Sequence, residues 1–245
     1  MTVFRRRVEI ATRMIGGSGV ARAALEDDYH HFRVDLAFEN DVVSHAVGFA
    51  VRIPYTACSE AGAMLAALVG MRIDAVANSV TRATDATLQC THILDLAGLA
   101  IAAATRGIAS RVYDIEVPRR VGTTTSGRID CDGVKVLEWH IDGAVITAPE
   151  AHAGVNLHQG LARWALSTLS QDLAEAALIL RRCLMISRGR ERNLDLVAHA
   201  IPSGNCYSQQ PSRAPTAIRI VGSTHDFTER PTVLCSDDQE FLAFV

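Results

Sequence analysis

The sequence predicts an α+β protein, built from antiparallel sheet or sheets with helices packed on one face. Stretches that alternate apolar and polar residues occur in groups, and long helical stretches follow these groups instead of alternating with single strands. The turn pairs Asn40-Asp41, Asp132-Gly133 and Asp142-Gly143 separate neighbouring stretches, which is typical of hairpins. Grouped strands joined by tight turns favour antiparallel pairing over a parallel, doubly wound sheet.

Composition excludes several functional classes. The chain has 245 residues with a net charge of −3, so it lacks the basic excess of nucleic-acid-binding proteins. It shows no secretory signal and no apolar run of the roughly 18–20 residues that a membrane span needs. We therefore expect a soluble cytoplasmic protein that binds neither nucleic acid nor membrane. Its six scattered cysteines are then expected to be free thiols.

The first predicted segment, residues 1–107, consists of strands followed by two helices. Strands are expected at residues 5–15, 20–26, 32–38 and 43–53, and helices at 59–69 and 87–105. Gly70 and Gly107 are the expected helix ends. The alternation in the third and fourth strands predicts that His30 and His45 face the core and that His31 faces solvent.

The second predicted segment, residues 108–245, begins again with strands. These are expected at residues 112–118, 127–131, 134–140 and 144–147. A loop over 148–158 carries His152 and His158, which we interpret as structural. One long helix over about 160–187 and an irregular tail complete the chain.

Reactive side chains coincide with predicted helix starts at two places. Cys58 follows the fourth strand, and Cys90 and His92 open the second helix. A helix N-terminus lowers the pKa of a thiol, so a thiolate and an imidazole could act as nucleophile and base. Together with His30, the same residues form a candidate ligand set for zinc or iron: His30, Cys58, Cys90 and His92.

Helix geometry limits this interpretation. Cys90 and His92 would point about 200° apart on a regular helix, so they can share a pocket only if the helix starts between them. The alternative is that Cys58 and Cys90 are small apolar core residues, because free cysteine is often buried. Tyr55 is either a hydroxyl donor in the site or a packing residue.

Several motifs resemble those of a widespread bacterial family of unknown function. They are His30 at a strand start, Pro54-Tyr55-x-x-Cys58, Leu68-x-Gly70 and Cys90-Thr91-His92. The usual family motif reads Gly-Cys-Thr-His-Leu, and Gln89 and Ile93 replace its Gly and Leu here. Segments near Leu180, Ile186 and Gly222 extend the resemblance over nearly the whole chain. The resemblance implies a setting in aromatic or acyl-CoA catabolism, and it brings no known reaction with it.

Residues 30–105 are also similar, more weakly, to the scaffold proteins of iron–sulfur cluster assembly. The shared features are a hairpin, Cys58 at a strand-to-helix turn, and Cys90 before an alanine-rich helix. The scaffold family uses three cysteines with an Asp or His. Here the cysteine of the hairpin is missing and His30 stands near its place. This resemblance implies a related fold for the N-terminal half, and the missing cysteine departs from the pattern of cluster assembly.

We therefore expect an enzyme that acts on a small organic molecule of the aromatic-acid or acyl-CoA type by lyase or hydrolase chemistry. Cys90, His92 and Tyr55 are its candidate catalytic residues. The alternatives are a metal, sulfur or iron–sulfur carrier and a non-catalytic ligand-binding or accessory protein. A homo-oligomer is expected in all three cases.

Overall fold

The computed structural model describes residues 2–245 and divides into two compact units, each of α+β type. The smaller unit contains the residues up to Arg7 with Val112–Asn193 and Asp226–Pro231. The larger unit contains Val8–Arg111, Leu194–His225 and Thr232–Val245. Strands β1 (Val3–Ile15) and β5 (Ser110–Pro118) contribute residues to both. Within residues 2–245 no helix combines the length and the apolar character needed to cross a membrane.

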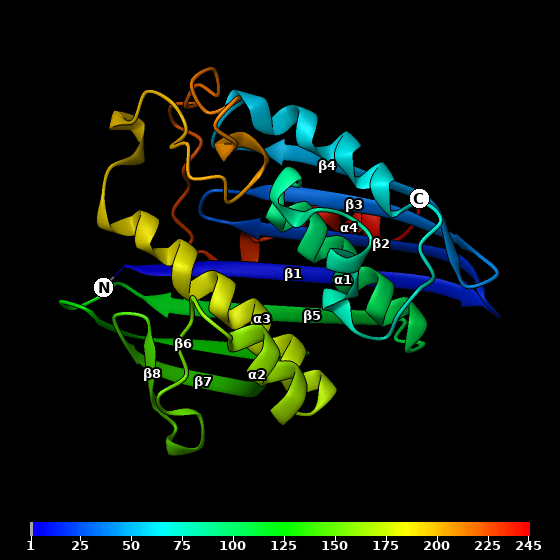
Figure 1. The fold of residues 1–245 in the computed structure, drawn as a ribbon, viewed down its shortest axis with the longest axis horizontal. Helices are drawn as coiled ribbons and strands as arrows, with labels where there is room; N and C mark the ends of the chain where they lie inside the picture. Colours follow the sequence, from blue (N-terminus) through cyan, green and yellow to red (C-terminus); the bar gives the residue numbers. More distant parts are fainter. Residues whose placement is uncertain (1) are drawn as a thin grey trace. The chain divides into compact units, whose positions relative to one another are not determined.

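The sheet of the larger unit has the strand order β4-β3-β2-β1. β2 (Ser18–Asp27), β3 (His31–Glu39) and β4 (Val42–Arg52) pair in antiparallel fashion. The predicted turn between β3 and β4 is confirmed, because Asn40 and Asp41 have φ angles of 53° and 62°. Helix α1 (Thr91–Thr105) packs on β2 and β3 and buries their apolar face, which includes Phe32, Val34, Leu36 and Phe38 (Figure 1).

The helical regions of the larger unit differ from the prediction in type. The stretch after β4 is a 3₁₀ helix, η1 (Thr56–Leu68), and η2 (Ala77–Arg82) and η3 (Ala86–Leu88) precede α1. The predicted end of α1 is confirmed, since Gly107 follows it with a φ of 67°. The β4 and η1 backbones touch, because a Cβ added at Gly62 would lie 2.0 Å from the carbonyl oxygen of Gly48.

Segments from the end of the chain complete the larger unit. Residues 194–225 contain η6 (Leu194–Leu196) and η7 (Tyr207–Gln209). η8 (Pro231–Val233) leads into the C-terminal segment, residues 232–245, which contains η9 (Ser236–Asp238) and α4 (Gln239–Leu242). In Figure 1 α1 lies in front of β2 and β3 and the red α4 lies behind them, so both faces of this sheet are covered.

Two predictions about side-chain direction are wrong. His31 is only 5% exposed, because the C-terminal segment covers the face on which it lies. His45 is exposed, because the pairing of β3 with β4 shifts between Ala37 and Phe38. Such a bulge inserts one residue and reverses the inward and outward alternation beyond it.

The smaller unit has the strand order β5-β6-β7-β8, all antiparallel. β6 (Thr124–Cys131), β7 (Val134–Asp142) and β8 (Val145–Ala148) lie close to the predicted ranges. The prediction of a single long helix is wrong, because α2 (Leu161–Thr168) and α3 (Gln171–Ile186) are separate helices. The Ser170 hydroxyl caps α3 by accepting the Leu173 N–H. Short 3₁₀ turns, η4 (Glu150–His152) and η5 (Ser187–Glu191), flank these helices.

Backbone contact between β4 and η1 yields a stability prediction. Gly62→Ala places a methyl group against the Gly48 carbonyl and should lower the free energy of unfolding by about 1–3 kcal/mol. Urea denaturation monitored by circular dichroism measures this change. Ala66→Ser, on the exposed side of the same helix, is the control and should change stability by less than about 0.5 kcal/mol. Equal stability of the two variants would contradict the close packing.

His152 in the smaller unit yields a pH prediction. Trp139 Nε1 donates to His152 Nδ1 at 2.9 Å, and burial lowers the His152 pKa from its ordinary 6.5. The unfolded chain therefore binds this proton more readily than the folded protein. The contribution of His152 to stability is complete above pH 6.5 and is lost as the pH falls towards the lower pKa of the folded protein. Melting temperatures measured from about pH 8 to 5 should fall less steeply for His152→Gln. Parallel curves for the two proteins would contradict the assignment.

Candidate functional site

The site is built on the turn that joins β2 to β3. Asp27 is completely buried there, and its Oδ1 accepts the backbone N–H groups of Tyr29 (2.7 Å) and His30 (2.8 Å). This is an Asx-type turn, in which an aspartate side chain replaces a backbone acceptor. His30 Nδ1 lies 3.1 Å from the same oxygen, so the ring can donate to an ionised Asp27 carboxylate in the tautomer that carries its proton on Nδ1. Asp27 thus fixes both the backbone and the ring of His30.

His92 reaches the turn from helix α1. It is the second residue of α1, and the contact of this helix with β2 and β3 carries it over the sheet. Its ring centroid lies 4.0 Å from that of His30, with an interplanar angle of 30°. Both rings also stack on Phe32, at 5.6 Å for His30 and 5.8 Å for His92. An apolar wall therefore backs the two imidazoles.

Asp27, His30 and His92 can act together as metal ligands. One ligand atom from each lies within 4.8 Å of the other two. Within residues 2–245 no other three His, Cys, Asp or Glu side chains meet this criterion. Two histidines and one carboxylate are a common ligand set for catalytic zinc and for non-haem iron(II), and they leave coordination positions open.

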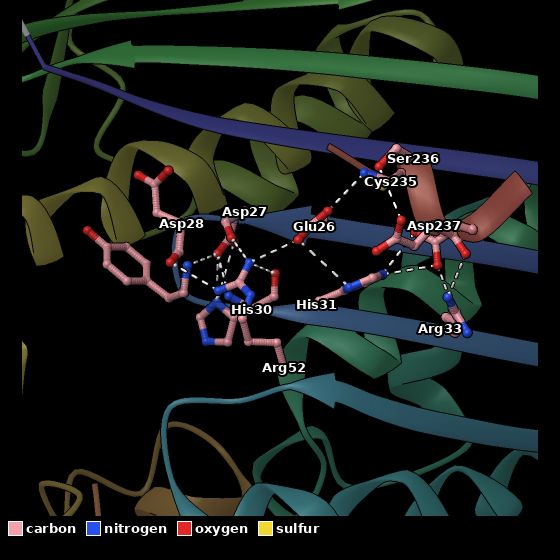
Figure 2. A network of polar contacts seen from close by, with 12 residues as sticks. Glu26, Asp27, Asp28, His30, His31, Arg33, Arg52, Cys235, Ser236 and Asp237 are labelled. Carbon is pink, nitrogen blue, oxygen red and sulfur yellow. Dashed lines mark hydrogen bonds and ion pairs between the residues drawn. The ribbon is translucent and has the colours of Figure 1, made fainter. Parts of the chain in front are cut away.

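Arg52, the last residue of β4, holds this turn from outside. Its guanidinium donates to the backbone carbonyls of Asp27 (2.5 Å), Asp28 (3.1 Å) and His30 (3.3 Å). It also donates to Glu26 Oε1 at 3.2 Å and to the Ser223 carbonyl at 2.9 Å. Figure 2 shows Arg52 beside His30, with Asp27 and Glu26 above it. The turn is therefore fixed by hydrogen bonds along its length.

The two cysteines that were predicted as site residues lie in a separate cluster of cysteines. Cys58 and Cys90 are 8% and 7% exposed, and Cys58 Sγ lies 2.9 Å from Ser208 Oγ. Burial raises the pKa of Cys58 from 9.0 to about 11 and that of Cys90 from 9.0 to about 12. The charge of Cys206 adds to both increases, so a third thiol lies close by. The expectation of lowered thiol pKa values is wrong, because burial outweighs the helix N-terminus.

The second helix begins later than the predicted residue 87: α1 starts at Thr91, between Cys90 and His92, and residues 86–88 form the separate turn η3. Cys90 is the N-cap residue of α1, and Thr91 is its first residue. Because Cys90 has an extended backbone and His92 a helical one, their side chains can point in different directions. His92 joins His30, whereas Cys90 lies with Cys58 and Cys206.

Tyr55 lies at a third place. Its backbone forms an antiparallel bridge with Arg219, and its side chain packs on a buried alanine cluster formed by Ala200, Ala214 and Ala217. The buried Arg219 guanidinium beside it donates to Asp195 at 2.9 Å. The structure thus ties Tyr55 to the segment 194–225 through its backbone and its ring.

Of the predicted site residues, the structure brings His30 and His92 together and adds Asp27, which the sequence analysis did not single out. A signal for it existed. An aspartate three residues before a histidine, in a short connection between strands, is typical of an Asx turn that orients the later residue. Arg52 carried no comparable signal, because its partners are backbone carbonyls.

Comparison with known proteins finds a similarity in the N-terminal part of the chain. Residues 12–106 match a family model described as a protein of unknown function (DUF2889). The matched span is less than half of the chain, and it includes Asp27, His30, Cys58, Cys90 and His92. No curated protein sequence matches the chain.

Thiol reactivity tests the burial of Cys58 and Cys90. With pKa values of about 11 and 12, fewer than about one in a thousand of either thiol is ionised near neutral pH. Iodoacetamide should therefore label both far more slowly than Cys131, which is half-buried and serves as the internal control. Peptide mass spectrometry after timed labelling measures the three rates. Labelling of native Cys90 as fast as Cys131 would contradict the burial.

Proposed function

We propose that the protein is a metal-dependent enzyme for a small organic substrate, with Asp27, His30 and His92 as the metal-binding residues. The observation that supports this proposal is the convergence of one carboxylate and two imidazoles within 4.8 Å. Ligands about 2.0–2.1 Å from an ion lie roughly 3 Å apart, so the three side chains would move closer together to hold zinc or iron(II).

The same residues support lyase or hydrolase chemistry. A divalent cation bound there would act as a Lewis acid toward a carbonyl or carboxylate oxygen of the substrate. The His30 and His92 rings are part-buried, and Phe32 stacks against both of them. Aromatic acids and acyl thioesters both present such an oxygen and remain the proposed substrate classes.

A specific contact favours a second candidate, a metal-free acid–base catalyst. The hydrogen bond from His30 Nδ1 to the buried Asp27 carboxylate orients the ring and leaves Nε2 for proton transfer. In that case Asp27 is a positioning residue, and His30 is the general base. Cys90 would not serve as the nucleophile, because its thiol stays protonated near neutral pH.

The carrier alternative was expected to use His30, Cys58 and Cys90. It now rests on the thiols alone. Cys58, Cys90 and Cys206 form a thiol group, and soft metals and iron–sulfur clusters prefer thiolates. Two observations weigh against this use. Burial raises the pKa of Cys58 and Cys90, and the three sulfurs do not meet the spacing that Asp27, His30 and His92 satisfy. The iron–sulfur scaffold resemblance therefore ranks below the metalloenzyme.

Metal binding is the direct test. Protein purified without an affinity tag should contain or take up close to one equivalent of zinc or iron(II), measured by elemental analysis and calorimetric titration. His30→Ala and His92→Ala should each weaken the affinity by at least about tenfold, because each removes a ligand. His45→Ala removes an exposed histidine of β4 and should leave the affinity unchanged.

The outcomes separate the candidates. Metal-free protein that turns over thioesters or aromatic acids, and loses this activity in His30→Ala, would replace the metalloenzyme with the acid–base catalyst. Metal that is retained in His30→Ala and His92→Ala but lost in Cys90→Ser would replace it with the thiol-based carrier.

A further inference from the structure

The C-terminal segment, residues 232–245, is attached to the outer face of the larger unit's sheet. Arg22 donates to the Phe241 carbonyl at 2.8 Å, and its guanidinium lies 4.9 Å from the Phe241 ring centroid. Arg13 donates to the Ala243 carbonyl at 2.8 Å and lies 4.6 Å from the Phe244 ring centroid. Cations from β1 and β2 therefore hold the segment through carbonyls and aromatic rings.

Asp238 is the buried centre of this attachment. It is completely inaccessible to solvent and accepts hydrogen bonds from His31 Nε2, at 2.9 Å, and from Arg33 Nε. Arg33 Nη2 also donates to the Asp237 carbonyl at 3.0 Å. Figure 2 shows His31 and Arg33 directed at the segment that carries Cys235, Ser236 and Asp237. A buried carboxylate with two such partners is a strong positional constraint.

Glu26 connects this centre to the metal-binding turn. Its Oε2 accepts the backbone N–H of Cys235 at 2.9 Å, and its Oε1 lies 3.7 Å from His31 Nδ1. The same Oε1 accepts Arg52 Nη2 at 3.2 Å. One carboxylate thus joins the C-terminal segment to the guanidinium that binds the carbonyls of Asp27, Asp28 and His30 (Figure 2).

We propose that Asp238 is a positioning residue for Asp27 and His30, and that the C-terminal segment is part of the functional site. Asp238 fixes His31, which directly follows His30 in the chain. The C-terminal segment also orients Glu26, and Glu26 in turn orients Arg52. Metal ligands commonly depend on such partners for their orientation. The inference rests on the proposed metal site, but the positioning itself can be measured without metal.

The test compares three full-length variants: Asp238→Asn, Asp238→Glu and Asp237→Asn. Asp237 is the matched control, because it is the neighbouring carboxylate and is exposed. The first readout is hydrogen exchange of the Tyr29 and His30 amides, which Asp27 Oδ1 accepts. The second is Zn²⁺ affinity by calorimetry. Asp238→Asn should speed exchange at both amides and weaken Zn²⁺ binding about tenfold, with Asp238→Glu restoring part of each.

The outcomes are distinguishable. Faster exchange confined to residues 232–245, with unchanged exchange at Tyr29 and His30, would overturn the positioning role and leave the metal site standing. Wild-type protein that binds no Zn²⁺, together with faster exchange at Tyr29 and His30 in Asp238→Asn, would overturn the proposed function and support the positioning role. If Asp237→Asn matched Asp238→Asn in both readouts, the positioning role of Asp238 would be overturned, because a general loss of charge would explain the effect.

Discussion

The completely buried carboxylate of Asp27 is the constraint on which the candidate site depends. A buried charge is costly unless hydrogen bonds compensate it, and here two backbone N–H groups and the His30 ring do so. These bonds require the chain to turn tightly between β2 and β3. They leave four carbonyl and carboxylate groups near the turn, and Arg52 satisfies them. The turn, the histidine and the arginine therefore form one structural unit.

The sequence predicts local features of this fold well. The alternation in β3 and the Asn40-Asp41 turn depend on neighbouring residues alone, and both are confirmed. His45 and His31 were assigned wrongly for two different physical reasons. A bulge shifts the alternation before His45, and a segment about two hundred residues away covers His31. Neither the extra residue of a bulge nor a distant covering segment leaves a periodic signal in the chain.

The thiols show why a residue's place in a helix does not determine its chemistry. The sequence places Cys90 near the start of a helix, and in the structure it is the N-cap residue of α1. A helix N-terminus favours a thiolate by up to about 2 kcal/mol. Burial acts in the opposite direction. The rise of the Cys90 pKa from 9.0 to about 12 corresponds to about 4 kcal/mol against the thiolate. Burial depends on the packing of η1 and the segment 194–225, which sequence spacing does not reveal.

The site thus divides into proposed ligands and supports, some of which lie in different parts of the chain. The three proposed ligands fall within residues 12–106, the span that matches the family model. Arg52, Glu26 and His31 also lie in this span, but their further partners do not: Ser223 accepts from Arg52, and Cys235 and Asp238 bind Glu26 and His31. A fragment limited to the matched span would keep every ligand while leaving Glu26, His31 and part of Arg52 without their partners. Because unpaired buried charges rearrange or lose their charge, such a fragment would not preserve the geometry of Asp27 and His30. In the proposed arrangement the irregular C-terminal part of the chain therefore contributes to the site together with the motif around His92.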